Sequence, residues 1–226
     1  MSNQLLTAED KHPEKFYNPR LICEVKDVLI ELTEEQNSQV NAKIQTFVAA
    51  LNNSGQSHKY YEENRNTLAL KAAEDNFIGK KAEVFVRWHL INERKFPHIS
   101  IDFEIRSGCS KGWTIDLPFA KKDERFPNIH VKSCQGWILQ YAKDFSWTFQ
   151  LSNNSGRGGR DSIFDGPDDD LVAFVFLENH LSSTATIKAI LPWGIIKNHL
   201  KDPVKESLVG LKKCIYLKDL QQALIF

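Results

Sequence analysis

Three residues with complementary chemistry lie on neighbouring segments in which polar and apolar residues alternate. Asp116 stands between apolar residues in WTIDLPF, and His130 and Lys132 alternate with apolar residues in NIHVKSC. Successive side chains of a β-strand point to opposite faces, so His130 and Lys132 share one face, which Asp116 joins if the two segments pair. Hydrolysis of a phosphodiester needs a hard cation on oxygen ligands and a positive group that positions the attacking water. Asp116 and Lys132 are the candidates for these two tasks, which predicts Mg²⁺-dependent chemistry.

The elements that must position these residues are a helical first part and a sheet that follows it. Helical spacing of apolar residues predicts helices over 33–51, 60–75 and 78–92. Period-two alternation predicts strands over 99–105, 113–119 and 129–134, joined as an antiparallel meander in the middle of the sheet. Further strands are predicted over 146–151, 171–177 and 186–191, of which the apolar run LVAFVFL indicates a fully buried strand. The fold class is therefore mixed α/β (α+β), with a central mixed sheet and helices on both faces.

The order and spacing of these motifs resemble a known family. A helical GKKAE ending in Glu83, then GWTID ending in Asp116, then IHVKS around Lys132, resemble the PD-(D/E)XK nuclease superfamily, particularly type II restriction endonucleases, over about residues 78–178. The resemblance implies a restriction-endonuclease-like fold, Mg²⁺ as cofactor and Asp116 as a metal ligand. It also implies a metal-facing backbone carbonyl at Val131, a second ligand at the position of His130, and Lys132 as the residue that assists the attacking water.

The chain departs from the family's pattern at two positions. Isoleucine precedes Asp116 where the family has proline, and His130 stands where the family has an acid. A neutral imidazole is a poorer Mg²⁺ ligand than a carboxylate, because Mg²⁺ prefers hard oxygen donors. Glu83 is the first candidate for the acidic ligand that His130 replaces, and Asp102 or Glu104 are the next candidates.

The surroundings of the candidate site are basic, although the whole chain has a formal net charge of zero. Residues 106–160 hold nine lysines and arginines against four acids, and phosphate contacts need such an excess. The segment 152–160 combines glycines, which allow close approach to a duplex, with amide and guanidinium groups that read base edges. The predicted partner is double-stranded DNA, and the candidate DNA-binding residues are Arg157, Arg160, Lys143, Asn154 and Gln150.

Less specific interpretations stay open for the same residues. Asp116 and Lys132 could form a structural ion pair, His130 could be an ordinary surface histidine, and Glu83 could be an exposed helix residue paired with Arg87. The segment 152–160 could be a flexible loop. Two other functions also remain: a nuclease of repair or recombination, and a DNA-binding protein with a degenerate site. A cysteine hydrolase using Cys134 and His130 is remote, since no orienting acid can be assigned.

Length and composition predict one domain of 226 residues. It divides into an arm with helices (1–77), a catalytic core (78–191) and a C-terminal helical and strand segment (192–226). No apolar run is long enough to cross a bilayer and no signal peptide is recognisable, so we expect no membrane partner and a cytoplasmic location. The four cysteines lack metal-ligand spacing and are expected to be reduced. A homodimer is expected, because two-fold symmetry matches a palindromic site.

Overall fold

The structure is a computed structural model. It describes residues 23–24, 26–53, 65–94, 96, 99–103, 116–117, 127–138, 144–151 and 160–223, with the backbone alone for residues 65–72. The main elements in chain order are β1 (Val28–Glu31), α1 (Glu34–Asn53), α2 (Arg65–Asn92), β2 (Ile129–Gln135), β3 (Ser146–Gln150), β4 (Leu171–Leu177), β5 (Thr184–Pro192), α4 (Trp193–Ile196), β6 (Lys212–Tyr216) and α5 (Leu217–Ala223).

The main sheet has four strands in the order β1-β5-β4-β2. β4 pairs antiparallel with β5 and parallel with β2, and β5 pairs antiparallel with β1, so the sheet is mixed as predicted. The seven residues of β4 are all apolar and six of them are buried, which confirms the prediction of a strand covered on both faces. A strand of this kind belongs in the interior of a sheet, and β4 and β5 lie there.

The predicted meander is described only in part. In the order of the described strands, β2 lies last, beside β4. On the other side of β2, Leu117 of the second predicted strand forms a single antiparallel bridge with Ile129, in agreement with the predicted pairing of these two segments. Of the first predicted strand, residues 100–103 are described without strand structure, and residues 104–115 and 118–126 lie outside the described residues. β4 lies inside the described sheet, between β5 and β2.

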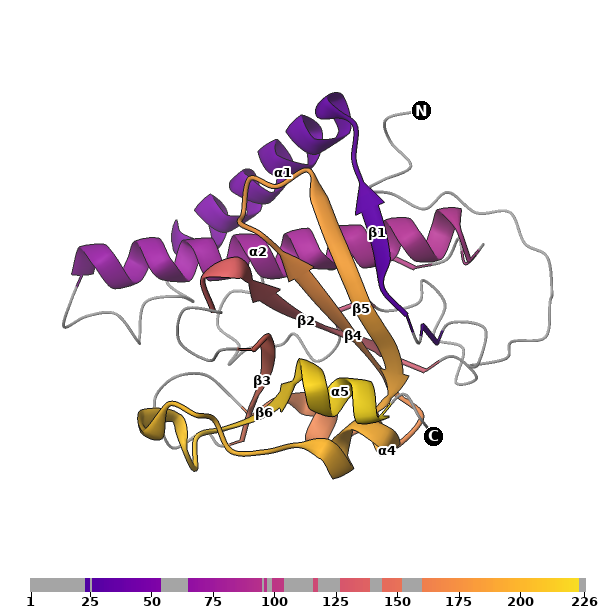
Figure 1. The fold of residues 1–226 in the computed structure, drawn as a ribbon. Helices are drawn as coiled ribbons and strands as arrows, with labels where there is room; N and C mark the ends of the chain where they lie inside the picture. Colours follow the sequence, from indigo (N-terminus) through magenta and orange to yellow (C-terminus); the bar gives the residue numbers. More distant parts are fainter. Residues whose placement is uncertain are drawn as a thin grey trace.

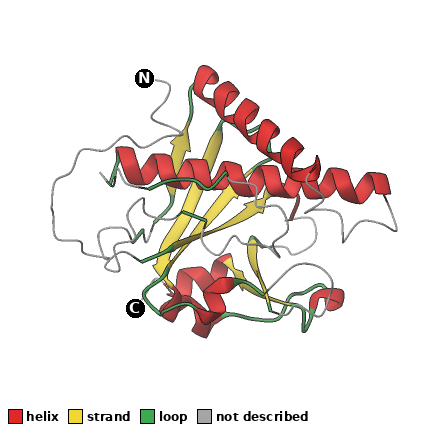
Figure 2. Cartoon of the chain, turned by 180° about the vertical axis from the view of Figure 1, so that it is seen from behind, coloured by secondary structure: helices red, strands yellow, loops and turns green. Residues whose placement is uncertain are grey.

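Two long helices cover one face of the sheet (Figures 1 and 2). α1 begins with the predicted capping box, in which Gln36 N–H donates to Thr33 Oγ1 at 3.2 Å and Thr33 N–H donates to Gln36 Oε1 at 3.0 Å. α2 is one continuous helix, so the two helices predicted over 60–75 and 78–92 are wrong as separate elements. No proline separates them, and one glycine, Gly79, does not break a helix that packs along its length.

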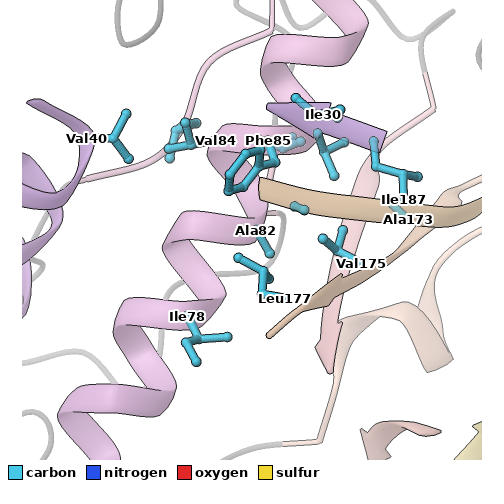
Figure 3. Close-up of a cluster of buried hydrophobic side chains, with 14 of the residues drawn as sticks. Ile30, Val40, Ile78, Ala82, Val84, Phe85, Ala173, Val175, Leu177 and Ile187 are labelled. Carbon is cyan, nitrogen blue, oxygen red and sulfur yellow. The ribbon is translucent and has the colours of Figure 1, made fainter. Parts of the chain in front are cut away.

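The apolar stripe of α2 holds this layer together. Figure 3 shows Ile78, Ala82 and Phe85 of α2 beside Leu177 and Val175 of β4, and all of these side chains are buried. They recur every three or four residues along the helix, and every second residue along the strand, so each element presents one continuous apolar surface to the other. This contact fixes the position of α2 beside β4 and β2.

The opposite face of the sheet is covered by a second, aromatic-rich core. The antiparallel ribbon of β3 and β6, together with α4 and α5, packs there, below the sheet in Figure 1. Trp147 and Phe149 of β3 meet Phe174 of β4 edge to face, with ring centroids 5.4 and 6.4 Å apart. Helices thus flank both faces, with a ribbon added on one side. None of the described helices combines the length and the apolar character that crossing a membrane requires.

A buried lysine ties α2 to the turn between β4 and β5. Lys81 is fully buried, and its ammonium donates to the backbone oxygen of His180 at 2.9 Å. Burial lowers the pKa of Lys81 from its ordinary value of 10.5 to about 8. The folded state therefore holds this proton less tightly than the unfolded state does.

Replacing Lys81 with methionine should stabilise the protein near pH 7 by about 1 to 3 kcal/mol. Between pH 8 and 10.5 the unfolded state binds more protons at this position, so the wild-type free energy of unfolding should rise with pH. Chemical denaturation across this pH range should show a smaller rise in the free energy of unfolding for Lys81→Met than for the wild type. The control is Lys205→Met, at an exposed position, whose free energy of unfolding should rise with pH as steeply as that of the wild type. An equally steep rise in Lys81→Met would show that burial does not lower the pKa of Lys81.

Candidate functional site

A pair of oppositely charged side chains is buried on α2, beside the apolar stripe. Glu83 is 5% exposed and Lys80, three residues earlier, is 8% exposed. The ammonium of Lys80 donates to both carboxylate oxygens of Glu83, at 3.0 and 2.8 Å. The interpretation of Glu83 as an exposed partner of Arg87 is therefore wrong, because Arg87 is itself buried and its Nε–H donates to the backbone oxygen of Ile99 at 2.6 Å.

Asp116 lies beside the edge of β2 that faces away from β4. The bridge between Leu117 and Ile129 brings this segment alongside the strand, and the backbone N–H of Val131 donates to Asp116 Oδ2 at 2.7 Å. The N–H and C=O of a strand residue point to the same side, so the carbonyl of Val131 faces this edge as well. A charge-assisted hydrogen bond of this kind fixes the orientation of the carboxylate.

Carboxylates from separate parts of the chain meet around one cavity between α2 and this edge. The cavity has a volume of about 150 Å³. It is lined by Phe47, Asp75, Asn76, Gly79, Lys80, Glu83, Asp102 and Asp116. Sequence reasoning named Glu83, Asp116 and, in reserve, Asp102, but it missed Asp75 and Lys80. The cavity therefore places four acids and one base around the same small volume.

The electrostatics of the cavity favour an added positive charge. Burial raises the pKa of Glu83 from its ordinary value of 4.5 to about 8, opposed by Lys80 and reinforced by the negative charges of Asp116 and Asp102. Carboxylate oxygens are also the donors that Mg²⁺ prefers, so the residues present fit this ion in chemical type. In the described part of the chain, however, no three His, Cys, Asp or Glu side chains are grouped closely enough to hold a metal ion. The acids surround the cavity without converging on one point.

Lys132 lies on the other side of β2. Its ammonium pairs with Asp161 Oδ2 at 2.7 Å and lies 5.1 Å from the ring centroid of Phe149, on the side of the β3–β6 ribbon. Asp116 borders the cavity on the side of α2, and the structure contains no ion pair between Asp116 and Lys132. The alternation of the strand explains this, because Lys132 shares a face with the second core while its neighbour Val131 packs against the first.

His130 is also directed away from the cavity. It is buried, and its Nε2 lies 3.6 Å from Asp170 Oδ2 at the start of β4. Asp170 is buried as well and accepts a hydrogen bond from the backbone N–H of Asn128 at 2.9 Å. The interpretation of His130 as an ordinary surface histidine is therefore wrong, and its contacts join β2 to the start of β4.

The candidate DNA-binding residues are only partly described. Arg160 is 45% exposed at its side chain, pairs with Asp165 at 3.4 Å and lies over the ring of Phe164. Gln150 ends β3, where its backbone N–H donates to Asp161 Oδ2 at 2.8 Å and its backbone oxygen accepts from Asp161 N–H at 3.0 Å. Asp161 thereby binds both Lys132 and the end of β3. The remaining candidates, Arg157, Lys143 and Asn154, lie outside the described residues.

The cysteines offer no alternative centre of reactivity in the described part of the chain. Cys134 and Cys214 are buried and form no disulfide. Burial raises the pKa of Cys134 to about 11, which disfavours the thiolate that a nucleophilic cysteine needs. The structure thus argues against the cysteine hydrolase interpretation.

The cavity beside α2 and the Lys132–Asp161 pair thus lie on opposite faces of β2. Their residues come from elements far apart in the sequence, which is typical of a functional site. Comparison of the chain with protein-family models, with curated proteins and with solved structures found no match.

Proposed function

We propose that this chain is a Mg²⁺-dependent endonuclease that hydrolyses phosphodiester bonds in double-stranded DNA, of the PD-(D/E)XK restriction type. The observation that carries the proposal is the meeting of Glu83, Asp102 and Asp116 around one cavity beside β2. A buried carboxyl such as that of Glu83, whose pKa is raised by burial and by the negative charges of Asp116 and Asp102, is costly for a fold, and such groups concentrate at functional sites. The order of the sequence motifs agrees with this placement.

Asp116 and Glu83 are the residues that would hold the metal ion, with Asp102 completing the set. When bound, Mg²⁺ polarises the scissile phosphate and lowers the pKa of a coordinated water. The N–H of Val131 orients Asp116, and the rigid α2 positions Glu83. His130 is not included among the ligands, because it contacts Asp170 and not the cavity.

Lys132 is proposed to contact the scissile phosphate from the opposite face of the same strand. β2 is the outermost strand described at this edge of the sheet, so a phosphate lying along the edge would be within reach of both faces. Asp161 holds the ammonium of Lys132 in the absence of substrate. A phosphate that takes over this ion pair would gain a positive group for its developing charge.

As a restriction-type enzyme, the chain is proposed to act as a homodimer that cuts each strand of a symmetric DNA site once. It rests on the motif resemblance and on the basic character of residues 106–160. Plasmid digestion with Mg²⁺ separates it from a nuclease of repair or recombination, because a restriction enzyme yields discrete fragments. Smeared or structure-dependent products would favour the repair or recombination function.

Replacing Lys132 with alanine should reduce the rate of Mg²⁺-dependent plasmid cleavage by about 10² to 10⁴ fold, since one positioned group is lost from the reaction. DNA affinity measured with Ca²⁺ should change by less than about tenfold, because only one phosphate contact is removed. Lys188→Ala is the matched control, since Lys188 also pairs with an aspartate, Asp27, and lies near a phenylalanine ring. Full cleavage by Lys132→Ala would remove Lys132 from the mechanism, and absence of any Mg²⁺-dependent cleavage by the wild type would refute the proposed function.

A further inference from the structure

We infer that Lys80 is a built-in counter-ion of the carboxylate cavity, which occupies the oxygens of Glu83 until a divalent cation displaces it. This inference rests on the proposed function, because it concerns the same cavity. The ammonium of Lys80 donates to both oxygens of Glu83, at 2.8 and 3.0 Å, and both side chains are more than nine-tenths buried. No motif in the sequence assigns a role to this lysine.

The lysine and a metal ion would compete for Glu83. The ammonium of Lys80 occupies one lone pair on each carboxylate oxygen, so a cation of charge two that uses these lone pairs must displace it. Electrostatic repulsion acts in the same direction, because two positive groups a few ångströms apart in a buried site repel strongly. Lys80 thus supplies positive charge to the acidic cavity and lowers its cost when no cation is bound.

The surroundings of Lys80 allow the ammonium to withdraw without losing all its partners. Its ammonium lies near two aromatic rings, 5.5 Å from the ring centroid of Phe47 and 5.9 Å from that of Phe103. Asp75 and Asn76 line the same cavity on the preceding turn of α2, and Asn76 is four residues before Lys80, the spacing at which helix side chains meet. The side chain can therefore turn along the helix and away from Glu83.

The decisive experiment is calorimetric titration of Mn²⁺ and of Mg²⁺ into the wild type and into Lys80→Met. Loss of the competing charge should tighten metal binding by about tenfold or more. Lys80→Gln is the second variant, because its amide N–H can still donate to Glu83 without a charge and so preserves the fold. Lys43→Met is the control: Lys43 lies over the same Phe103 ring, at 4.9 Å, and its removal should change metal affinity by less than about threefold.

A measurement on the unaltered protein complements the variants. Acetylation of lysines, followed by mass spectrometry, should label Lys80 several times faster when saturating Mg²⁺ is present, while labelling of Lys43 stays constant. Equal labelling of Lys80 with and without Mg²⁺, or metal binding in Lys80→Met that is no tighter than in the wild type, would overturn the inference.

Including Asp116→Asn in the titration separates this inference from the proposed function. If the wild type binds metal, Asp116→Asn does not, and Lys80→Met binds no more tightly, the counter-ion role fails and the metal site stands. If neither the wild type nor Lys80→Met binds metal, both fail. Metal binding that appears only when Lys80 is replaced would support the counter-ion role.

Discussion

Asp116→Asn should lower the rate of Mg²⁺-dependent DNA cleavage by about a thousandfold or more, because a metal ligand contributes several kcal/mol to stabilisation of the transition state. The fold should persist, since the asparagine oxygen can still accept the hydrogen bond from the N–H of Val131. Cleavage rates and calorimetric titration of Mg²⁺ check this result together: the variant should lose metal binding as well as activity.

The control for this substitution is Asp27→Asn. Asp27 is an exposed acid on the far side of the sheet, where it pairs with Lys188. Its replacement should leave cleavage and metal binding within about threefold of the wild type, as expected for a surface ion pair. Wild-type cleavage by Asp116→Asn would exclude this residue from the reaction.

Glu83→Gln should remove metal-dependent cleavage and the pH dependence of stability that the Glu83 carboxyl causes. Burial raises the pKa of Glu83 to about 8, so the folded state of the wild type binds more protons than the unfolded state between pH 4.5 and 8. The wild-type free energy of unfolding should therefore fall as the pH rises through this window. Glutamine does not titrate, so Glu83→Gln should lack this fall, and its stability relative to the wild type should rise between pH 5 and 8 by an amount on the order of 2 kcal/mol.

Urea denaturation at pH 5, 6.5 and 8 provides the test, with Glu31→Gln as the control at an exposed position on β1. The gain in stability of Glu83→Gln over the wild type should grow with pH, whereas Glu31→Gln should follow the wild type at every pH. If the free energy of unfolding of Glu83→Gln fell between pH 5 and pH 8 by as much as that of the wild type, the Glu83 carboxyl would not be destabilised by its burial.

The parts of the fold that the sequence predicts well are those where one local pattern decides the structure. The seven consecutive apolar residues of β4 predict a strand that is buried on both faces, which is what the structure has. Thr33 and Gln36 form the predicted capping box at the start of α1. β2 was predicted over 129–134 and extends over Ile129–Gln135, because its alternation matches two distinct cores on its two faces.

Long-range pairing explains what the sequence does not predict. Nothing in the period-two pattern around Lys132 indicates which strands lie beside it, so the parallel pairing of β2 with β4 depends on competition among all the strands. The continuity of α2 likewise comes from packing along its length, which overrides the weak local signals near Gly79.

The candidate site was predicted in part, for a related reason. Glu83, Asp102 and Asp116 were named from their residue types, and the cavity brings them together. Lys80 was missed, although a lysine and a glutamate three positions apart lie among the apolar residues of the predicted helix and offered a signal. Lys132 was placed on the same face as Asp116, but Asp116 reaches the edge of β2 on the side of α2, which strand alternation alone does not reveal.

The proposed function requires a divalent cation to bind between α2 and the edge of β2. Anomalous diffraction from crystals of the wild-type protein soaked in Mn²⁺ tests this most directly. We predict one strong peak in the cavity, at a distance of about 2.1 Å from carboxylate oxygens of Asp116 and Glu83, with Lys80 withdrawn from Glu83. Fully soaked crystals without a peak there, or with Mn²⁺ bound only elsewhere, would contradict the proposed site.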